Sequence, residues 1–289
     1  MAEAGAYERP GGLTSALALL TARPWRMLAG GTDLYPMTGA RALVGDILDL
    51  TGLEELRGIT LSREGLRIGA CVRWAEIAGA SLPPALAALQ QAAREVGGRQ
   101  IQNAGTIGGN LCNASPAADG VPPLLALGAE VQLASADAAR RMALADFVTG
   151  PRQTALRPGE MLAAVVIPRA GLMGRSRFVK LGARKYLVIS IASVAVRLVE
   201  REGRVADLAV AVGACSAVAR RIAAVESALR DAPLAEAAAR VRDQDVAAAL
   251  APLDDIRATA VYRAGAAAEL IRRAVADLAV AKPAGDSDG

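Results

Sequence analysis

One stretch of the chain, residues 97–123, limits what the rest can fold into. Its sequence, GGRQIQNAGTIGGNLCNASPAADGVPP, is rich in glycine, asparagine and proline, which favour turns over regular helices and strands. An irregular connection of this length is uncommon inside a compact domain unless it has a function of its own. We therefore expect an irregular loop that forms part of a binding site.

Two glycine-rich turns are candidates for that site: AGGTDL at 29–34 and TIGGN at 106–110. Successive glycines lack Cβ atoms, so their backbone N–H groups can point into one concavity and bind a pyrophosphate without a lysine. The alternative is that each glycine pair only turns the chain. Neither turn matches the G-x-G-x-x-G or G-x-x-x-x-G-K-[ST] pattern. The residues alone therefore indicate a nucleotide-like ligand and nothing finer.

The composition excludes several classes of mechanism. The chain contains no histidine, which removes Ser-His and Cys-His catalysis, histidine metal ligands and a flavin tethered through imidazole. Its three cysteines, Cys71, Cys112 and Cys215, form no C-x-x-C pair, so this chain alone is not expected to hold zinc or an iron–sulfur cluster. We expect no disulfide framework, and we interpret Cys112 as a small buried apolar residue.

Charge and hydropathy predict a cytoplasmic protein. With 53% hydrophobic and 21% charged residues, the chain can form a substantial core. It has no apolar run of about 18 residues and no basic, apolar start, so we expect neither a membrane span nor a signal peptide. A net charge of +4 without a basic block gives no reason to expect a nucleic-acid partner.

Hydrophobic patterning predicts an alternation of helices and strands. We expect strands at 25–29, 45–50, 59–61, 66–68, 130–135, 161–167, 175–181, 192–199 and 205–212. We expect helices at 14–20, 82–96, 124–127, 222–229, 234–242 and 254–278, the first of them capped by Thr14. A break at 168–174 predicts a domain boundary near 170–176.

Three segments together resemble a known family: AGGTDL, IQNAGTIGGNLCNASPAAD and DFVTGPRQTALRPGEMLAAVVIP. They are similar to the FAD-binding (medium) subunit of the molybdenum hydroxylases, the xanthine dehydrogenase and carbon monoxide dehydrogenase family. The resemblance implies an α+β fold: an FAD-binding domain of the p-cresol methylhydroxylase type in two α/β subdomains, then an α+β domain like the carbon monoxide dehydrogenase flavoprotein C-terminal domain. The expected boundaries are 1–56, 57–174 and 175–281, with a disordered tail at 282–289.

The resemblance also assigns residues to non-covalent FAD binding. The first segment, with its diphosphate contact at Gly30–Thr32, comprises Arg26, Met27, Leu28, Ala29, Gly30, Gly31, Thr32, Asp33 and Leu34. The remaining expected contacts are Val96, Gly97, Ala104, Thr106, Ile107, Gly108, Gly109, Asn110, Ala114, Ser115, Asp119, Leu162 and Lys180. Asp33 and Asp119 can alternatively be read as cap or turn carboxylates, and Lys180 as a solvated cation at a strand end. We expect no catalytic side chain and no metal ligand, and we expect valine at Gly31 or Gly109 to abolish FAD binding.

The segment at 178–190 resembles the family stretch that brings the C-terminal domain over the flavin ring. Val188 stands where many members carry an acid, and Ile191 where xanthine dehydrogenases have a lysine. These differences put the redox environment of the flavin, and so its oxidant, in question.

The resemblance implies an electron-transfer subunit that passes electrons from [2Fe–2S] clusters through FAD to NAD⁺, O₂ or a quinone. A molybdopterin-binding large subunit and a [2Fe–2S] small subunit are the implied partners, in a dimer of heterotrimers. One alternative is a free-standing FAD oxidoreductase acting directly on an organic substrate, which would need a general acid or base. Another is a non-enzymatic nucleotide-binding module.

Overall fold

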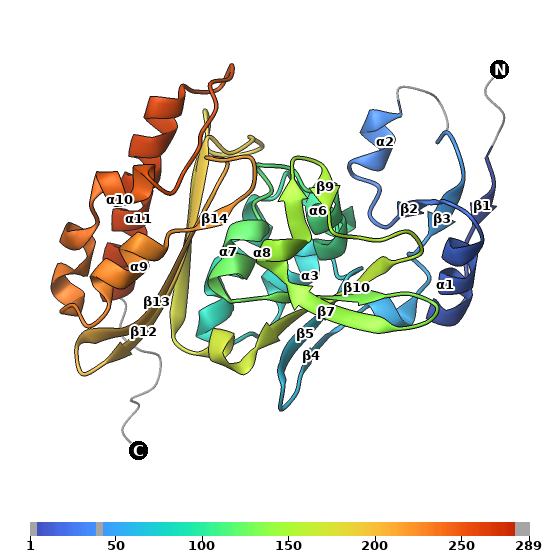
Figure 1. Cartoon of the computed structure of the whole chain (residues 1–289), viewed down its shortest axis with the longest axis horizontal. Helices are drawn as coiled ribbons and strands as arrows, with labels where there is room; N and C mark the ends of the chain where they lie inside the picture. The colour runs from blue at the N-terminus through green and yellow to red at the C-terminus, as the bar shows by residue number, and fades with distance from the viewer. Residues whose placement is uncertain (1–4, 39–42, 281–289) are drawn as a thin grey trace.

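The structure is a computed structural model that describes residues 5–38 and 43–280. Figure 1 shows an N-terminal, a central and a C-terminal sheet in succession along the molecule, with helices between the central and C-terminal sheets and against the outer face of the latter. Two further strands, β8 (Val148–Gly150) and β9 (Gln153–Thr154), pair as a small separate sheet. In the described part of the chain, no helix has both the length and the apolar character needed to cross a bilayer.

The N-terminal sheet is parallel and has the order β1-β3-β2. Its elements, with the short helix that comes after them, are β1 (Tyr7–Glu8), α1 (Leu13–Ala22), β2 (Arg26–Leu28), α2 (Leu34–Met37), β3 (Ile47–Asp49) and η1 (Glu54–Leu56). The predicted strands at 25–29 and 45–50 are confirmed. The predicted Thr14 cap is wrong: α1 begins at Leu13 after Gly12, and the Glu55 carboxylate accepts a hydrogen bond from the amide of Leu13 at 2.9 Å.

The central sheet is antiparallel, with the order β4-β5-β10-β6-β7. Its strands are β4 (Ile59–Leu61), β5 (Gly65–Gly69), β6 (Glu130–Ala134), β7 (Ala139–Ala143) and β10 (Met161–Pro168). The predicted 59–68 hairpin is confirmed. The hydrophobic pattern did not predict β7 or the elements α3 (Trp74–Gly79), α8 (Leu144–Phe147), β8 (Val148–Gly150) and β9 (Gln153–Thr154).

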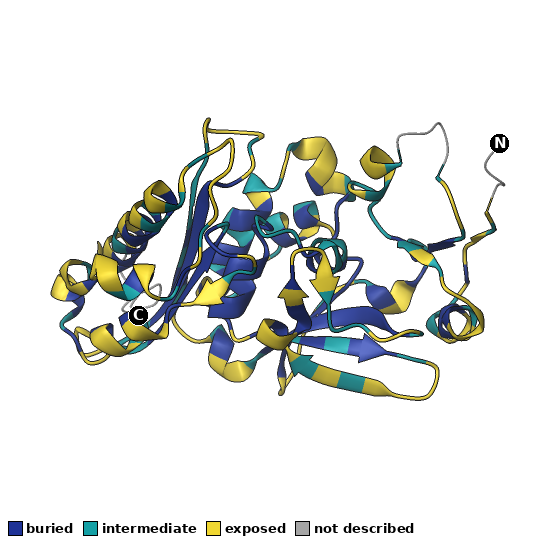
Figure 2. Cartoon of the chain, turned by 45° about the horizontal axis from the view of Figure 1, so that its top comes forward, coloured by how far each residue is buried: buried dark blue, intermediate teal, exposed yellow. Residues whose placement is uncertain are grey.

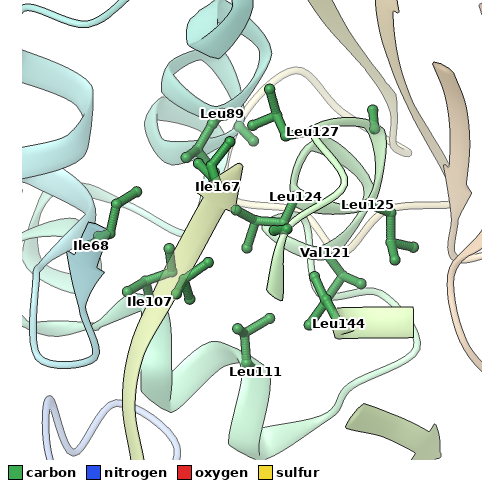
Figure 3. Close-up of a cluster of buried hydrophobic side chains, with 14 of the residues drawn as sticks. Ile68, Leu89, Ile107, Leu111, Val121, Leu124, Leu125, Leu127, Leu144 and Ile167 are labelled. Carbon is green, nitrogen blue, oxygen red and sulfur yellow. The ribbon is translucent and has the colours of Figure 1, made fainter. Parts of the chain in front are cut away.

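The 97–123 segment is mostly helical, so the expectation of an irregular loop is wrong. It contains α5 (Arg99–Ala104), α6 (Ile107–Asn113) and the start of α7 (Val121–Ala126). Two glycines inside α6 cost about 1 kcal/mol each in helix propensity. Burial of Ile107 and Leu111 in the core opposes that cost, and Figure 3 shows both side chains in the hydrophobic cluster beside β10. Tertiary packing overrides local preference here.

The predicted 82–96 helix is confirmed as η2 (Pro84–Leu86) followed by α4 (Ala87–Glu95). With α7, helix α4 lies between the central sheet and the C-terminal sheet, and both pack against C-terminal strands. The Ser176 hydroxyl accepts a hydrogen bond from the amide of Ala88 at 2.8 Å, and the Gln91 side chain accepts one from Phe178 at 2.8 Å. These contacts hold the C-terminal sheet against the helices that flank the candidate site.

The C-terminal sheet is antiparallel, with the order β11-β12-β13-β14. After η3 (Arg169–Leu172), its elements are β11 (Arg175–Leu181), β12 (Ala192–Arg201), β13 (Arg204–Gly213), β14 (Arg220–Arg221), α9 (Ala223–Leu229), η4 (Leu234–Arg240), α10 (Asp243–Ala247) and α11 (Ala260–Val280). Figure 2 shows long buried stretches of β12 and β13 with the more exposed helices outside them.

Two expected helices in this region differ from the structure. The 234–240 segment is a 3₁₀ helix, and α11 begins at Ala260 rather than at 254. Asp255 accepts hydrogen bonds from the amides of Arg257 and Ala258, which makes a turn where we expected helix. Thr259 then accepts from the amide of Tyr262 and caps α11. The expected tail at 282–289 lies outside the described residues.

Candidate functional site

A cavity of about 810 Å³ lies where the first glycine-rich turn, the α4–α6 region and the 187–189 loop meet. This volume falls within the roughly 300–1,000 Å³ usual for ligand pockets. The predicted site residues that line it are Arg26, Met27, Ala29, Gly30, Gly31, Thr32, Asp33, Leu34, Val96, Gly97, Thr106, Gly108, Gly109, Asn110, Ser115, Asp119, Leu162 and Lys180. The other four predicted residues, Leu28, Ala104, Ile107 and Ala114, lie behind the cavity wall.

The first turn, Gly30–Asp33, presents free backbone donors. The amides of these four residues have no hydrogen-bond acceptor among the described residues. Gly31 has φ +69°, a conformation that residues with a Cβ rarely adopt. A Cβ on Gly30 would overlap the carbonyl oxygen of Ala104, so Ala104 supports the turn from behind. Unpaired amides around a concavity are suited to an anionic group.

The second turn begins helix α6, and the amides of Ile107–Asn110 are all bonded within the protein. Ile107 donates to the carbonyl of Val72 and Gly108 to that of Ala70, at 3.0 and 2.9 Å. Gly109 donates to the Thr106 hydroxyl and Asn110 to the Thr106 carbonyl, both at 3.0 Å. All four amides therefore have acceptors within the protein, and the expected cofactor contact at this turn stays a prediction. This turn contributes wall residues to the cavity: Thr106, Gly108, Gly109 and Asn110.

A buried ion pair, Asp119 with Lys180 of β11, forms part of the cavity wall. The ammonium of Lys180 lies 2.7 Å from a carboxylate oxygen of Asp119, and the hydroxyl of Ser190 donates to the other oxygen at 2.5 Å. Asp119 is 7% exposed and Ser190 is 1% exposed. Burial raises the pKa of the Asp119 carboxyl, while Lys180 and Ser190 act against that rise. The readings of Asp119 as a cap and of Lys180 as a solvated cation do not fit these contacts.

The two departures noted at 188 and 191 have different surroundings. Val188 lines the cavity, as do Leu187 and Ile189 beside it. Ile191 is buried away from the cavity, and its carbonyl accepts a hydrogen bond from Arg263 at 2.7 Å. Only the first difference therefore changes the cavity wall.

The cysteines are protonated thiols at neutral pH. Burial raises the pKa of Cys112, which lines the cavity, to about 12 and that of Cys215 to about 11. Cys71, also in the wall, has a pKa raised by burial to about 11. In the described ranges, no group of three or more Cys, Asp or Glu side chains could hold a metal ion.

Several wall residues were not predicted from sequence. They include Trp74, Ile101, Arg152, Leu187 and Ile189. Arg152 and Leu187 have φ of 60° and 52°, and Ala114, behind the wall, has φ 45°. Non-glycine residues in this region cluster at ligand sites, but a sequence gives no sign of such a conformation when glycine is not used.

The comparison with protein families decides the identity. The family described as the FAD binding domain in molybdopterin dehydrogenase matches residues 2–170, and the CO dehydrogenase flavoprotein C-terminal domain matches residues 177–278. The chain belongs to the FAD-binding subunits of the molybdopterin dehydrogenases. The resemblance inferred from the sequence is thus confirmed, as is the α+β fold class.

Individual relatives agree with this family. The xanthine dehydrogenase FAD-binding subunit of Escherichia coli O157:H7 is 31% identical over 269 residues, which cover 91% of this chain and 92% of the relative. The nicotine 6-hydroxylase medium subunit of Paenarthrobacter nicotinovorans is 30% identical, with coverage of 94% and 96%. A structure of reconstituted CO dehydrogenase from Oligotropha carboxidovorans matches with a TM-score of 0.86 at 29% identity and covers 96% of this chain and 99% of that one.

The residues of this FAD-binding subunit fit the cofactor that its family implies. The free amides of Gly30–Asp33 suit a diphosphate. Asn110 lines the cavity, and its buried side-chain oxygen Oδ1 has no hydrogen-bond partner among the described residues. Trp74, Leu162 and Val188 provide apolar wall for a ring. The chain is thus an oxidoreductase component, in which bound FAD supplies the capacity to accept and release electrons.

Proposed function

We propose that this chain is the electron-transfer subunit of a molybdenum hydroxylase complex. It takes electrons from [2Fe–2S] clusters on a partner subunit into non-covalent FAD and delivers them to NAD⁺, O₂ or a quinone. The observation that carries this proposal is the cavity, whose wall combines the free amides of Gly30–Asp33 with the buried Asp119–Lys180 pair. The 1–56 and 57–174 subdomains would hold FAD, and the 175–281 domain would close the site.

The relay needs iron–sulfur clusters, and the ligands for them must come from partner subunits. With three dispersed cysteines and no histidine, it cannot itself build the clusters of the relay. A molybdopterin-binding large subunit and a [2Fe–2S] small subunit therefore complete the complex that we propose, as a dimer of heterotrimers. We propose a cytoplasmic location, where free thiols such as these three stay reduced.

A free-standing oxidoreductase is the second candidate, because the cavity contains a carboxyl whose pKa is raised, Asp119. That carboxyl is bound by both Lys180 and Ser190. Each oxygen already accepts a hydrogen bond, and both contacts favour the ionised carboxylate, which makes Asp119 a weaker base. We favour the relay subunit for this reason.

The test asks where electrons enter. Flavin in the isolated chain should not be bleached by purines, N-heterocycles, aldehydes or carbon monoxide, because C–H hydroxylation needs the molybdenum centre. Bleaching should appear when the molybdenum and iron–sulfur subunits are restored, and chemically reduced flavin in the isolated chain should still reduce an artificial acceptor. Stopped-flow bleaching of the isolated chain by such a substrate at catalytic rates would support the free-standing enzyme instead.

A further inference from the structure

Arg152 is a cavity residue to which no role has been given. Within the described part of the chain the cationic side chains that line the cavity are Arg26, Arg152 and Lys180. Lys180 is neutralised by Asp119, whereas Arg26 has no carboxylate partner in the described ranges and its guanidinium donates to the carbonyl of Val44 at 2.9 Å. Arg152 has no carboxylate partner among the described residues, and its guanidinium donates only to the carbonyl and side-chain oxygens of Asn113.

The backbone at Arg152 is held in an unfavourable conformation. Its φ of 60° lies in the left-handed region, and its amide donates to the carbonyl of Ala114, which has φ 45°, at 2.9 Å. Such conformations are unfavourable for residues with a Cβ and persist where the surroundings enforce them. The tight turn between β8 and β9 thereby carries the arginine to the cavity.

Asn113 connects Arg152 to the first glycine-rich turn. Its side-chain amide donates to a carboxylate oxygen of Asp33 at 2.8 Å while its side-chain oxygen accepts from Arg152. Asp33 is the last residue of the turn whose amides are free. One asparagine side chain therefore separates an uncompensated guanidinium from the turn with four unpaired N–H groups.

We propose that Arg152 binds the diphosphate of FAD together with the amides of Gly30–Asp33. This inference rests on the proposed function, which supplies FAD as the ligand, and it adds a residue that lies outside the sequence-predicted site. Amide donors orient the phosphate oxygens, and the planar guanidinium supplies a charge that the first turn itself does not. Asp33 does not neutralise that charge directly, because the Asn113 amide lies between them.

The experiment uses the full chain stripped of flavin and titrated with FAD, with riboflavin and with inorganic pyrophosphate. Arg152→Gly removes the guanidinium and suits the left-handed backbone, so folding should be retained. We expect it to raise the Kd for FAD about ten- to hundredfold, to leave the Kd for riboflavin unchanged and to abolish competition by pyrophosphate. Arg152→Lys should recover part of the loss. Arg99→Met is the matched control, since Arg99 begins α5 beside the cavity but does not line it.

The outcomes separate this inference from the proposed function. A wild-type chain that binds no flavin would overturn the FAD assignment, while loss of pyrophosphate binding in Arg152→Gly alone would still support the anion site. A wild-type Kd for FAD in Arg152→Gly would overturn the role of Arg152. Equal losses of FAD and riboflavin, or a loss in Arg99→Met as large as in Arg152→Gly, would also overturn it, because the effect would then not belong to a phosphate contact of this side chain.

Discussion

The two glycine-rich turns of the cavity look alike in sequence and differ in what their amides do. At 30–33 all four N–H groups are unpaired among the described residues, and Gly31 needs the left-handed conformation. At 107–110 all four are bonded within the protein, and the glycines lie in a helix. A glycine pair therefore does not by itself indicate a phosphate site. The deciding feature is whether the neighbouring chain offers acceptors for the amides.

The difference arises from the helix on the C-terminal side of each turn. The 30–33 turn leads only into the four-residue helix α2, which lies outside the large core, so no described acceptor packs over the amides. Helix α6 is instead driven into the core by Ile107 and Leu111, which brings its first turn against the carbonyls of Ala70 and Val72. One region is open for a ligand, and the other supports the cavity wall.

The largest effect we expect comes from the buried ion pair in the wall that both turns share. Lys180→Met leaves the buried carboxylate of Asp119 without its counter-ion, which typically costs about 3–5 kcal/mol of unfolding free energy. The folded state of the variant should then take up a proton at Asp119, whose pKa burial already raises. The folded pKa lies above the unfolded value of about 3.9, so stability should fall as pH rises above about 4.

Urea unfolding of Lys180→Met between pH 4 and 8 measures this loss. The double variant Lys180→Met with Asp119→Asn removes both charges and should recover much of the stability, without the pH dependence. Lys185→Met is the matched control, because Lys185 is exposed. If the Lys180 and Lys185 variants were equally stable at pH 8, the ion pair of Lys180 with Asp119 would not stabilise the fold.

The second effect belongs to the open turn. Gly31→Val places a β-branched residue at φ +69°, with its Cβ 2.5 Å from the Tyr35 ring, and the displaced turn should weaken FAD binding at least about a hundredfold. Gly109 has helical φ, and a Cβ there meets only the Thr106 hydroxyl at 3.0 Å. We therefore restrict the expected loss to Gly31 and expect less than about a tenfold change for Gly109→Val.

Flavin fluorescence titration of the two variants, with circular dichroism to check folding, makes this measurement. Equal losses at Gly31 and Gly109 would show that close approach of backbone to ligand, and not free amides, decides binding at both turns.

The sequence predicted the parts of the fold that depend on local patterning. The hairpin at 59–68 and the valine-rich strands β12 and β13 were predicted because short apolar runs with β-branched residues, bounded by turn residues, favour strands. Helix α6 was not, because glycine and asparagine disfavour helix locally and the packing of Ile107 and Leu111 in the core stabilises it. The later start of α11 was missed because the Asp255 turn depends on side-chain hydrogen bonds.

For the site, the motifs led to most of the residues around the cavity, but their roles depend on contacts that no motif contains. The Asp119–Lys180–Ser190 cluster joins residues separated by up to 71 positions along the chain. Arg152 could not be found, because its place depends on a left-handed backbone at a residue other than glycine. Pairing partners and backbone strain are set by tertiary structure, and a single sequence does not display them.

The smallest effect we expect concerns the cap of the closed turn. Thr106→Val keeps the shape of the side chain but removes the hydroxyl that accepts from Gly109 at 3.0 Å. Loss of such a cap costs about 1 kcal/mol, and Thr106→Ser should restore it because serine supplies the same acceptor.

In the Thr106→Val variant, the amide of Gly109 would lose its partner in the wall of the cavity, as the amides of the first turn lack theirs. If a free N–H group is enough to bind a diphosphate, the Thr106→Val variant should bind FAD more tightly although it unfolds more easily. We expect the stability loss without that gain, because one freed amide adds little to a site that already has the four free amides of Gly30–Asp33 and Arg152 linked to them through Asn113. Urea unfolding and FAD titration of the Val and Ser variants decide the point, and a tighter Kd in Thr106→Val would show that the two turns differ only in their caps.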